Sequence, residues 1–240
     1  MANLVFLAGA LVRPPELRYT AKGVAILEAT LGGVSAKGER ERTWYCRVRL
    51  LGGHAEAIAD RLDVGALLLG EGRLEYRKWE QGGEKRSELQ VVLDRLGFLE
   101  REGREVRVDA RGQPLLHDAL NLVFLSGNLT RDPELRHTPQ GTPVARFGLA
   151  VNERRQEEER AHFVEVQAWR HLAERVGRMR RGQGVMLSGG LFAESWLGSD
   201  GVKRYRLFVE ADQVWERAWL TSPGLHKEAG LDVPEDALPF

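Results

Sequence analysis

The chain of 240 residues contains a long internal repeat, and this repeat constrains the fold more than any other feature of the sequence. Residues 3–23 read NLVFLAGALVRPPELRYTAKG and residues 121–141 read NLVFLSGNLTRDPELRHTPQG, and 14 of the 21 positions are identical. Matched residues continue at nearly the same offset, for example Trp79 with Trp196. A period of this length is too long for a solenoid unit and indicates a duplicated domain.

The repeat divides the chain into four expected parts. We expect copy 1 at residues 1–100, a linker at residues 101–120, copy 2 at residues 121–217 and a flexible tail at residues 218–240. The linker carries four basic and four acidic residues, and the tail mixes proline and glycine with polar groups.

Both copies show the same succession of apolar and polar segments, which predicts five strands and one short helix in each. The expected strands are residues 4–11, 24–31, 43–51, 66–79 and 86–99 in copy 1, and 122–129, 144–151, 162–169, 185–196 and 203–215 in copy 2. The expected helices are residues 54–62 and 171–179, and the expected polar loops are residues 35–42 and 152–160. This layout predicts an all-β chain of two tandem OB-folds, each a five-stranded barrel. Another small barrel, such as an SH3-like one, is the alternative, and the helix between the third and fourth strands favours the OB-fold.

Composition limits the kind of protein more than it identifies a partner. Hydrophobic residues make up 42% of the chain, which is enough for packed cores. The 35 basic and 35 acidic residues give the whole chain no net charge. Residues 1–217 carry 34 basic and 31 acidic residues, so this part of the chain is slightly basic and the tail is acidic. The single Cys46 leaves no intrachain disulfide and indicates a reducing, intracellular setting. We expect neither a secretory signal nor a membrane span.

Strand alternation predicts an outer face with aromatic and basic side chains on each barrel. The expected inward residues of the third strands are Cys46, Val48 and Leu50 in copy 1 and Val164, Val166 and Ala168 in copy 2. The expected outward residues are Tyr45, Arg47, Arg49, Leu51, Arg73, Glu75, Arg77 and Trp79 in copy 1, and Phe163, Glu165, Gln167, Trp169, Phe192 and Trp196 in copy 2.

Exposed rings beside arginines are suited to unpaired nucleic-acid bases. Any base can stack on an aromatic ring whatever its identity, and nearby cations neutralise phosphates. The predicted nucleic-acid-binding residues are Tyr45, Arg47, Arg49, Arg73, Arg77, Trp79, Lys85, Arg86, Arg154, Arg155, Phe163, Trp169, Phe192, Trp196, Lys203 and Arg204. The alternative is that Trp79 and Trp196 pack over their own hairpins, and the recurrence of a ring in both copies favours stacking. Ordinary edge-strand charges are the alternative for the Lys-Arg pairs.

The last residues, DVPEDALPF, combine acidic groups with apolar anchors. A disordered end is the usual reading of such a terminus. Leu238, Pro239 and Phe240 beside Glu235 and Asp236 instead indicate a short peptide that docks in a basic-rimmed apolar pocket of a partner protein.

The repeated opening stretch, the HFVEVQAW strand, the Gly-Gly-Leu to Trp196 strand and the DALPF ending together resemble the family of bacterial single-stranded-DNA-binding proteins. The match covers nearly the whole chain and is similar to the duplicated form of that family. The resemblance implies a homodimer carrying four OB-folds. It also implies a tail tip that recruits replication, recombination and repair enzymes, in the cytoplasm and associated with the nucleoid.

The resemblance also implies roles for individual residues. Tyr45 and Phe163 stand at a stacking position early in the third strand, and Trp79 and Trp196 stand on the long hairpin. Trp169 matches the aromatic at the end of the third strand, where copy 1 has Leu51. The family aromatic after the second strand is missing, with Lys37 and Arg155 near its place.

Three further functions remain as alternatives to binding single-stranded DNA. For an enzyme, the chain lacks a Walker A sequence, H-E-x-x-H, G-x-S-x-G and Cys-x-x-Cys, so we expect no catalytic residue, cofactor or metal. A protein-interaction scaffold and an RNA-specific binder are both compatible with an OB-fold. Quenching of tryptophan fluorescence by oligo(dT), and competition with oligo(U), discriminate among them.

Overall fold

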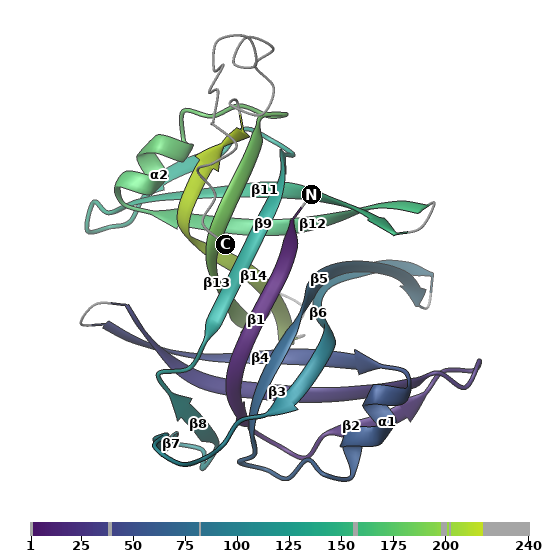
Figure 1. The fold of residues 1–240 in the computed structure, drawn as a ribbon. Coiled ribbons are helices and arrows are strands. Elements are labelled where there is room, and N and C mark those ends of the chain that lie inside the picture. Colours follow the sequence, from purple (N-terminus) through teal and green to yellow (C-terminus); the bar gives the residue numbers. More distant parts are fainter. Residues whose placement is uncertain are drawn as a thin grey trace, which may run out of the picture.

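The structure, a computed structural model, describes residues 2–37, 40–81, 83–155, 158–197, 201 and 203–217. These residues form fourteen strands and two short helices, arranged as two barrels (Figure 1). Neither helix in this part of the chain has the length and apolar character that a membrane crossing needs.

Copy 1 forms a closed five-stranded barrel. Its strands are β1 (Asn3–Leu11), β3 (Ala25–Lys37), β4 (Arg40–Leu51), β5 (Leu67–Gln81) and β6 (Glu84–Phe98). They pair in the order β1-β3-β4-β6-β5 and return to β1, and only the β4–β6 pair in this ring is parallel. A short strand, β2 (Glu16–Tyr19), lies on β3, and helix α1 (Gly53–Ala59) connects β4 to β5. This connectivity confirms the OB-fold predicted for copy 1.

Copy 2 repeats the same barrel. Its strands are β9 (Asn121–Leu129), β11 (Pro143–Arg155), β12 (Glu158–Trp169), β13 (Gly184–Leu197) and β14 (Lys203–Glu216), with β10 (Glu134–His137) lying on β11. The ring order β9-β11-β12-β14-β13 matches copy 1, including one parallel pair, β12–β14. Helix α2 (His171–Val176) again connects the third strand to the fourth. Each expected strand and helix is therefore present.

The repeated opening stretch forms the first strand of each barrel and also joins the two barrels. β1 and β9 pair antiparallel, with Val5 opposite Val123, so a single sheet runs through both copies. Figure 1 shows these two strands side by side between the barrels. Val5, Leu7, Val123 and Leu125 are fully buried. The apolar repeat thus supplies both the barrel cores and the connection between them.

The segment 101–120 contains two strands in the structure. β7 (Val106–Val108) and β8 (Pro114–His117) form a hairpin, and β8 pairs in parallel with β3 of copy 1. Leu115 and Leu116 of β8 are buried. The segment therefore extends the sheet of copy 1 and packs against its barrel.

The prediction of polar loops at residues 35–42 and 152–160 is wrong for most of their length. β3 and β4 pair as far as Lys37 opposite Arg40, and β11 and β12 pair as far as Arg155 opposite Glu158. Polar side chains are compatible with strands where both faces of a hairpin meet water, so composition alone does not reveal the pairing.

Candidate nucleic-acid interface

Copy 2 displays two exposed aromatic rings on the strands that flank β14. Phe163 on β12 is 43% exposed and Trp196 on β13 is 44% exposed. Trp169, at the end of β12, is half-buried, and its Nε1 donates a hydrogen bond to Glu210 Oε2 at 3.1 Å. The two exposed rings are available to a ligand that stacks on them.

The predicted stacking residue Phe192 is covered by a side chain of copy 1. The guanidinium of Arg42, from β4, lies 3.4 Å from the centroid of the Phe192 ring, within the range of a cation–π contact. Arg42 also forms an ion pair of 2.5 Å with Glu210 of β14. Arg42 thus links the two copies and occupies one face of the ring. The sequence shows no signal for this contact, because nothing local to Arg42 or Phe192 indicates that the two copies meet there.

In copy 1 the corresponding aromatic is tied to the segment between the copies. Tyr45 is half-buried, and its hydroxyl donates a hydrogen bond of 2.6 Å to Asp109 Oδ2. Burial and this hydrogen bond to a carboxylate raise the pKa of Tyr45 to about 12. The same bond, helped by the main-chain N–H groups of Gln113 and Arg111, lowers the pKa of Asp109. Tyr45 is therefore less free than Phe163 to stack with a ligand.

The predicted basic residues of copy 1 differ in how far they are engaged. Arg47 and Arg77 are exposed, and the Arg77 guanidinium lies 5.9 Å from the ring centroid of half-buried Trp79. Arg49 is half-buried, and its Nε lies 2.7 Å from Glu28 Oε1. Burial alone would raise the pKa of Glu28, but Arg49 and Arg18 outweigh it and lower the pKa. Arg47 and Arg77 are thus the better placed for phosphates.

Arg73 is not on an exposed face, and that expectation is wrong. Its side chain is buried, with a residue exposure of 7%. Its Nη1 lies 2.6 Å from Asp94 Oδ1, and its Nε lies 3.6 Å from Glu153 Oε1 of copy 2. Carboxylates from both copies surround it because copy 2 packs over this part of β5. Arg73 therefore holds the copies together in this structure.

A buried histidine makes a further polar connection between the copies. His162 is 3% exposed, its Nδ1 accepts a hydrogen bond of 3.0 Å from the main-chain N–H of Tyr76, and its Nε2 lies 3.1 Å from Glu153 Oε2. The ring of Tyr76 meets that of Phe163 edge to face, with centroids 5.5 Å apart. Tyr76 lies between the expected outward residues Glu75 and Arg77, so strand alternation directs it to the core and gives no sign of a binding role.

The remaining predicted residues stay predictions. At Lys85, Arg86, Arg154, Arg155, Lys203 and Arg204 the structure describes the strand and not the side chains. Glu235, Asp236, Leu238, Pro239 and Phe240 lie outside the described residues.

Metal binding needs a cluster of histidine, cysteine or acidic side chains, and thiol chemistry needs a reactive cysteine. In the described ranges, no group of three or more His, Cys, Asp or Glu side chains is placed to hold a metal ion. Cys46 is buried, and burial raises the pKa of its thiol to about 12, so the thiol stays protonated near neutral pH.

Comparison with known families supports the duplication. The model of the single-strand binding protein family matches twice, at residues 2–99 and 120–215. A single-stranded DNA-binding protein of Thermus thermophilus is 58% identical over 259 residues, covering 99% of this chain and 98% of that protein. One of Deinococcus radiodurans is 43% identical over 225 residues, covering 88% of this chain and 74% of that protein.

Solved structures show the same arrangement. The crystal structure of wild-type single-stranded DNA binding protein from Thermus aquaticus aligns with a TM-score of 0.73 at 46% sequence identity. The alignment covers 90% of this chain and 92% of that chain. The similarity therefore includes both barrels.

Proposed function

Because the chain belongs to the single-strand binding protein family, we propose that it binds single-stranded DNA without regard to base sequence. The observation that carries the proposal is the exposure of two predicted stacking rings of copy 2, Phe163 and Trp196. Bases stack on these rings, and exposed arginines such as Arg47 and Arg77 neutralise phosphates. Copy 1 contributes to binding more through its charged side chains than through stacking, because the Tyr45 hydroxyl is hydrogen-bonded to Asp109.

The proposed interface also includes residues whose side chains are not described. These residues come from the long hairpins of the two barrels, where they would contact the phosphate backbone of the DNA. They are Lys85, Arg86, Arg154, Arg155, Lys203 and Arg204. The proposed domains are residues 1–100 and 121–217, joined by the linker 101–120 and followed by the tail 218–240.

The direct test is a titration of intrinsic tryptophan fluorescence with oligo(dT). The proposal predicts strong quenching at low salt and weaker binding as salt rises, since bound phosphates release counterions. Unchanged fluorescence and unchanged electrophoretic mobility at low salt would contradict it. Competition with oligo(U) tests the preference for DNA, and recovery of intact oligonucleotide after incubation with Mg²⁺ tests the absence of nuclease activity.

The proposed setting is DNA replication, recombination and repair in the bacterial cytoplasm, where the protein protects single strands on the nucleoid. The proposed assembly is a homodimer with four OB-folds, since closed two-fold symmetry is the commonest form of soluble oligomers. Light scattering of the full chain tests this: a mass of two chains supports it, and a mass of one chain or of four contradicts it.

The tail is proposed to recruit partner proteins. Deleting residues 232–240 removes negative charge from the chain, so we expect DNA affinity to stay the same or rise. Recovery of replication and repair proteins on immobilised chain should be lost. Equal recovery of the same partners by the full and the truncated chain would contradict the recruiting role.

A further inference from the structure

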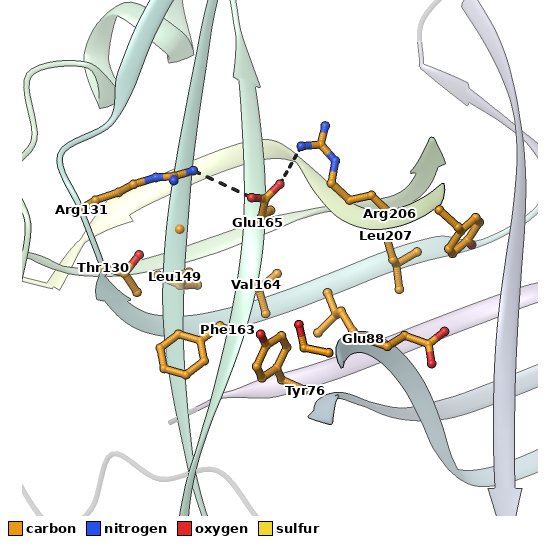
Figure 2. Close-up of a pocket in the computed structure, with 14 residues that line it drawn as sticks. Tyr76, Glu88, Thr130, Arg131, Leu149, Phe163, Val164, Glu165, Arg206 and Leu207 are labelled. Carbon is orange, nitrogen blue, oxygen red and sulfur yellow. Dashed lines mark hydrogen bonds and ion pairs between the residues drawn. The ribbon is translucent and has the colours of Figure 1, made fainter. Parts of the chain in front are cut away.

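A cavity of about 360 Å³ lies at the junction of the two copies (Figure 2). Copy 1 contributes Tyr76 of β5 and Glu88 of β6, and copy 2 contributes Phe163 of β12 and Tyr205 of β14. Its volume lies at the lower end of the range of roughly 300–1,000 Å³ that is typical of pockets for small organic ligands. Since walls come from both copies, neither barrel forms this cavity alone.

Two aromatic rings form a corner of the cavity. The planes of Tyr76 and Phe163 meet at 83°, and Figure 2 shows the two rings next to each other. The hydrogen bond from the Tyr76 N–H to His162 Nδ1 joins β5 to β12 directly beside these rings. A flat ligand against the face of one ring meets the edge of the other, and both arrangements are favourable for aromatic groups. The corner is thus held in place before any ligand arrives.

The charges of the cavity favour a neutral group inside it and a phosphate outside. The charged lining residues are two arginines, Arg131 and Arg206, and two glutamates, Glu88 and Glu165. Glu165 pairs with Arg206 at 2.8 Å and with Arg131 at 3.9 Å, and Figure 2 shows both guanidinium groups directed at it. A phosphate therefore meets no net positive charge inside.

A cation lies beside the corner instead. The Nζ atom of Lys78, an exposed residue, lies 5.6 Å from the Tyr76 ring centroid and 5.7 Å from that of Phe163. A phosphate attached to a group stacked in the corner can reach this ammonium. An uncharged ring joined to a phosphate is the chemistry of a nucleotide.

We infer that this cavity, the inter-copy pocket, receives one nucleobase of a DNA strand that passes from copy 1 to copy 2. The inference rests on the proposed function and names a subsite within it. The base stacks in the corner of Tyr76 and Phe163, its edge faces the polar groups of the lining, and its phosphate lies near Lys78. A strand that crosses the junction fills the pocket, and a short strand bound to one barrel leaves it empty.

Photo-crosslinking of the full chain tests the inference. One OB-fold engages about 4–16 nucleotides. An oligo(dT) of about 35 nucleotides therefore spans both copies, whereas one of about 8 nucleotides can bind to a single barrel. Thymines of the longer strand are replaced by 5-iodouracil, and crosslinked peptides are mapped by mass spectrometry after irradiation. We expect crosslinks to Tyr76 and to Tyr205, one on each side of the junction.

Affinity measurements with three variants complete the test. Tyr76→Leu should weaken binding of the long strand by about fivefold or more and leave the short strand unchanged, because it removes one stacking ring. Tyr76→Phe keeps the ring and should bind both strands as the unmodified chain does. Tyr19→Leu is the matched control, since Tyr19 is an exposed tyrosine on β2 outside the pocket.

The outcomes separate this inference from the proposed function. If the unmodified chain binds both strands while Tyr76→Leu binds the long one within about twofold of it, the pocket is not used and the proposed function still stands. Equal weakening for both lengths indicates a general structural effect of Tyr76 and also counts against the pocket, as does a lack of crosslinks at Tyr76 and Tyr205. If the unmodified chain binds neither strand at low salt, the proposed function and the inference fail together.

Discussion

The two copies share a fold but use the same strand position for different contacts. Trp44 of β4 and His162 of β12 stand 118 residues apart at equivalent places, and both are buried. Trp44 donates a hydrogen bond of 2.9 Å to Ser35 Oγ, and Ser35 donates one of 2.8 Å to the carbonyl of Ala119. His162 instead bonds to the main chain of Tyr76 in the other copy.

The two copies also differ at the aromatic residue that follows this position, Tyr45 in copy 1 and Phe163 in copy 2. In copy 1 the segment 101–120 packs along β3 and holds Tyr45 through Asp109. In copy 2 the equivalent ring, Phe163, keeps 43% of its surface exposed. The two copies therefore do not present equal binding faces, because the segment that connects them packs against copy 1.

The largest expected effect concerns stability and compares the two buried residues. Trp44→Ala should cost about 3–5 kcal/mol of unfolding free energy, because it leaves a cavity in a packed core. His162→Ala should cost less, about 1–3 kcal/mol, because the main loss is the acceptor for the Tyr76 N–H. Urea unfolding of both variants gives the two values. A larger loss for His162→Ala would mean that the junction, and not the core of copy 1, limits stability.

The next effect concerns the tryptophans of the two long hairpins. Trp196→Leu should weaken oligo(dT) binding by about 1–3 kcal/mol, the usual contribution of one stacked base. Trp79→Leu is the matched change in copy 1 and should cost less, since Trp79 is half-buried beside Arg77. Fluorescence anisotropy of a labelled strand measures both. Equal losses of affinity would show that the hairpin tryptophans do not account for the difference in DNA binding between the two copies.

The smallest expected effect is a pH dependence confined to the segment 101–120. A hydrogen bond of 2.9 Å to Glu41 raises the pKa of His117, and it lowers the pKa of Glu41. A raised folded-state pKa means that protonated His117 stabilises the docked segment fully below its ordinary pKa of about 6.5, and that the gain is lost as pH rises through the folded-state value.

The measurement for this effect is the thermal midpoint of the unmodified chain minus that of His117→Asn, taken at several pH values. The difference should shrink from acidic to alkaline pH. If the difference in thermal midpoint grew as pH rises, it would contradict the stabilising role of the His117–Glu41 pair.

The residues that the sequence placed correctly are those governed by local patterns. Alternation along the third strands predicts that Cys46, Val48 and Leu50 face the core, and all three are buried. Apolar runs and the repeat likewise predict both barrels and the position of each helix, because barrel closure follows from strand order and inward apolar faces.

The residues that the sequence did not place depend on contacts between distant parts of the chain. Arg73 is buried by Glu153, and Phe192 is covered by Arg42, and each pair joins one copy to the other. Tyr76 meets Phe163 across the same junction. The alternation of residues along a strand predicts to which face of the sheet a side chain points. It does not predict which side chains of the other barrel contact that face.

The central claim is that copy 2 carries more of the stacking energy than copy 1. The most direct measurement compares oligo(dT) affinity of Phe163→Leu and Tyr45→Leu, matched changes at equivalent positions, on strands long enough to contact both copies. The account predicts a loss of about fivefold or more for Phe163→Leu and a clearly smaller loss for Tyr45→Leu. Equal losses, or a larger loss for Tyr45→Leu, would contradict it.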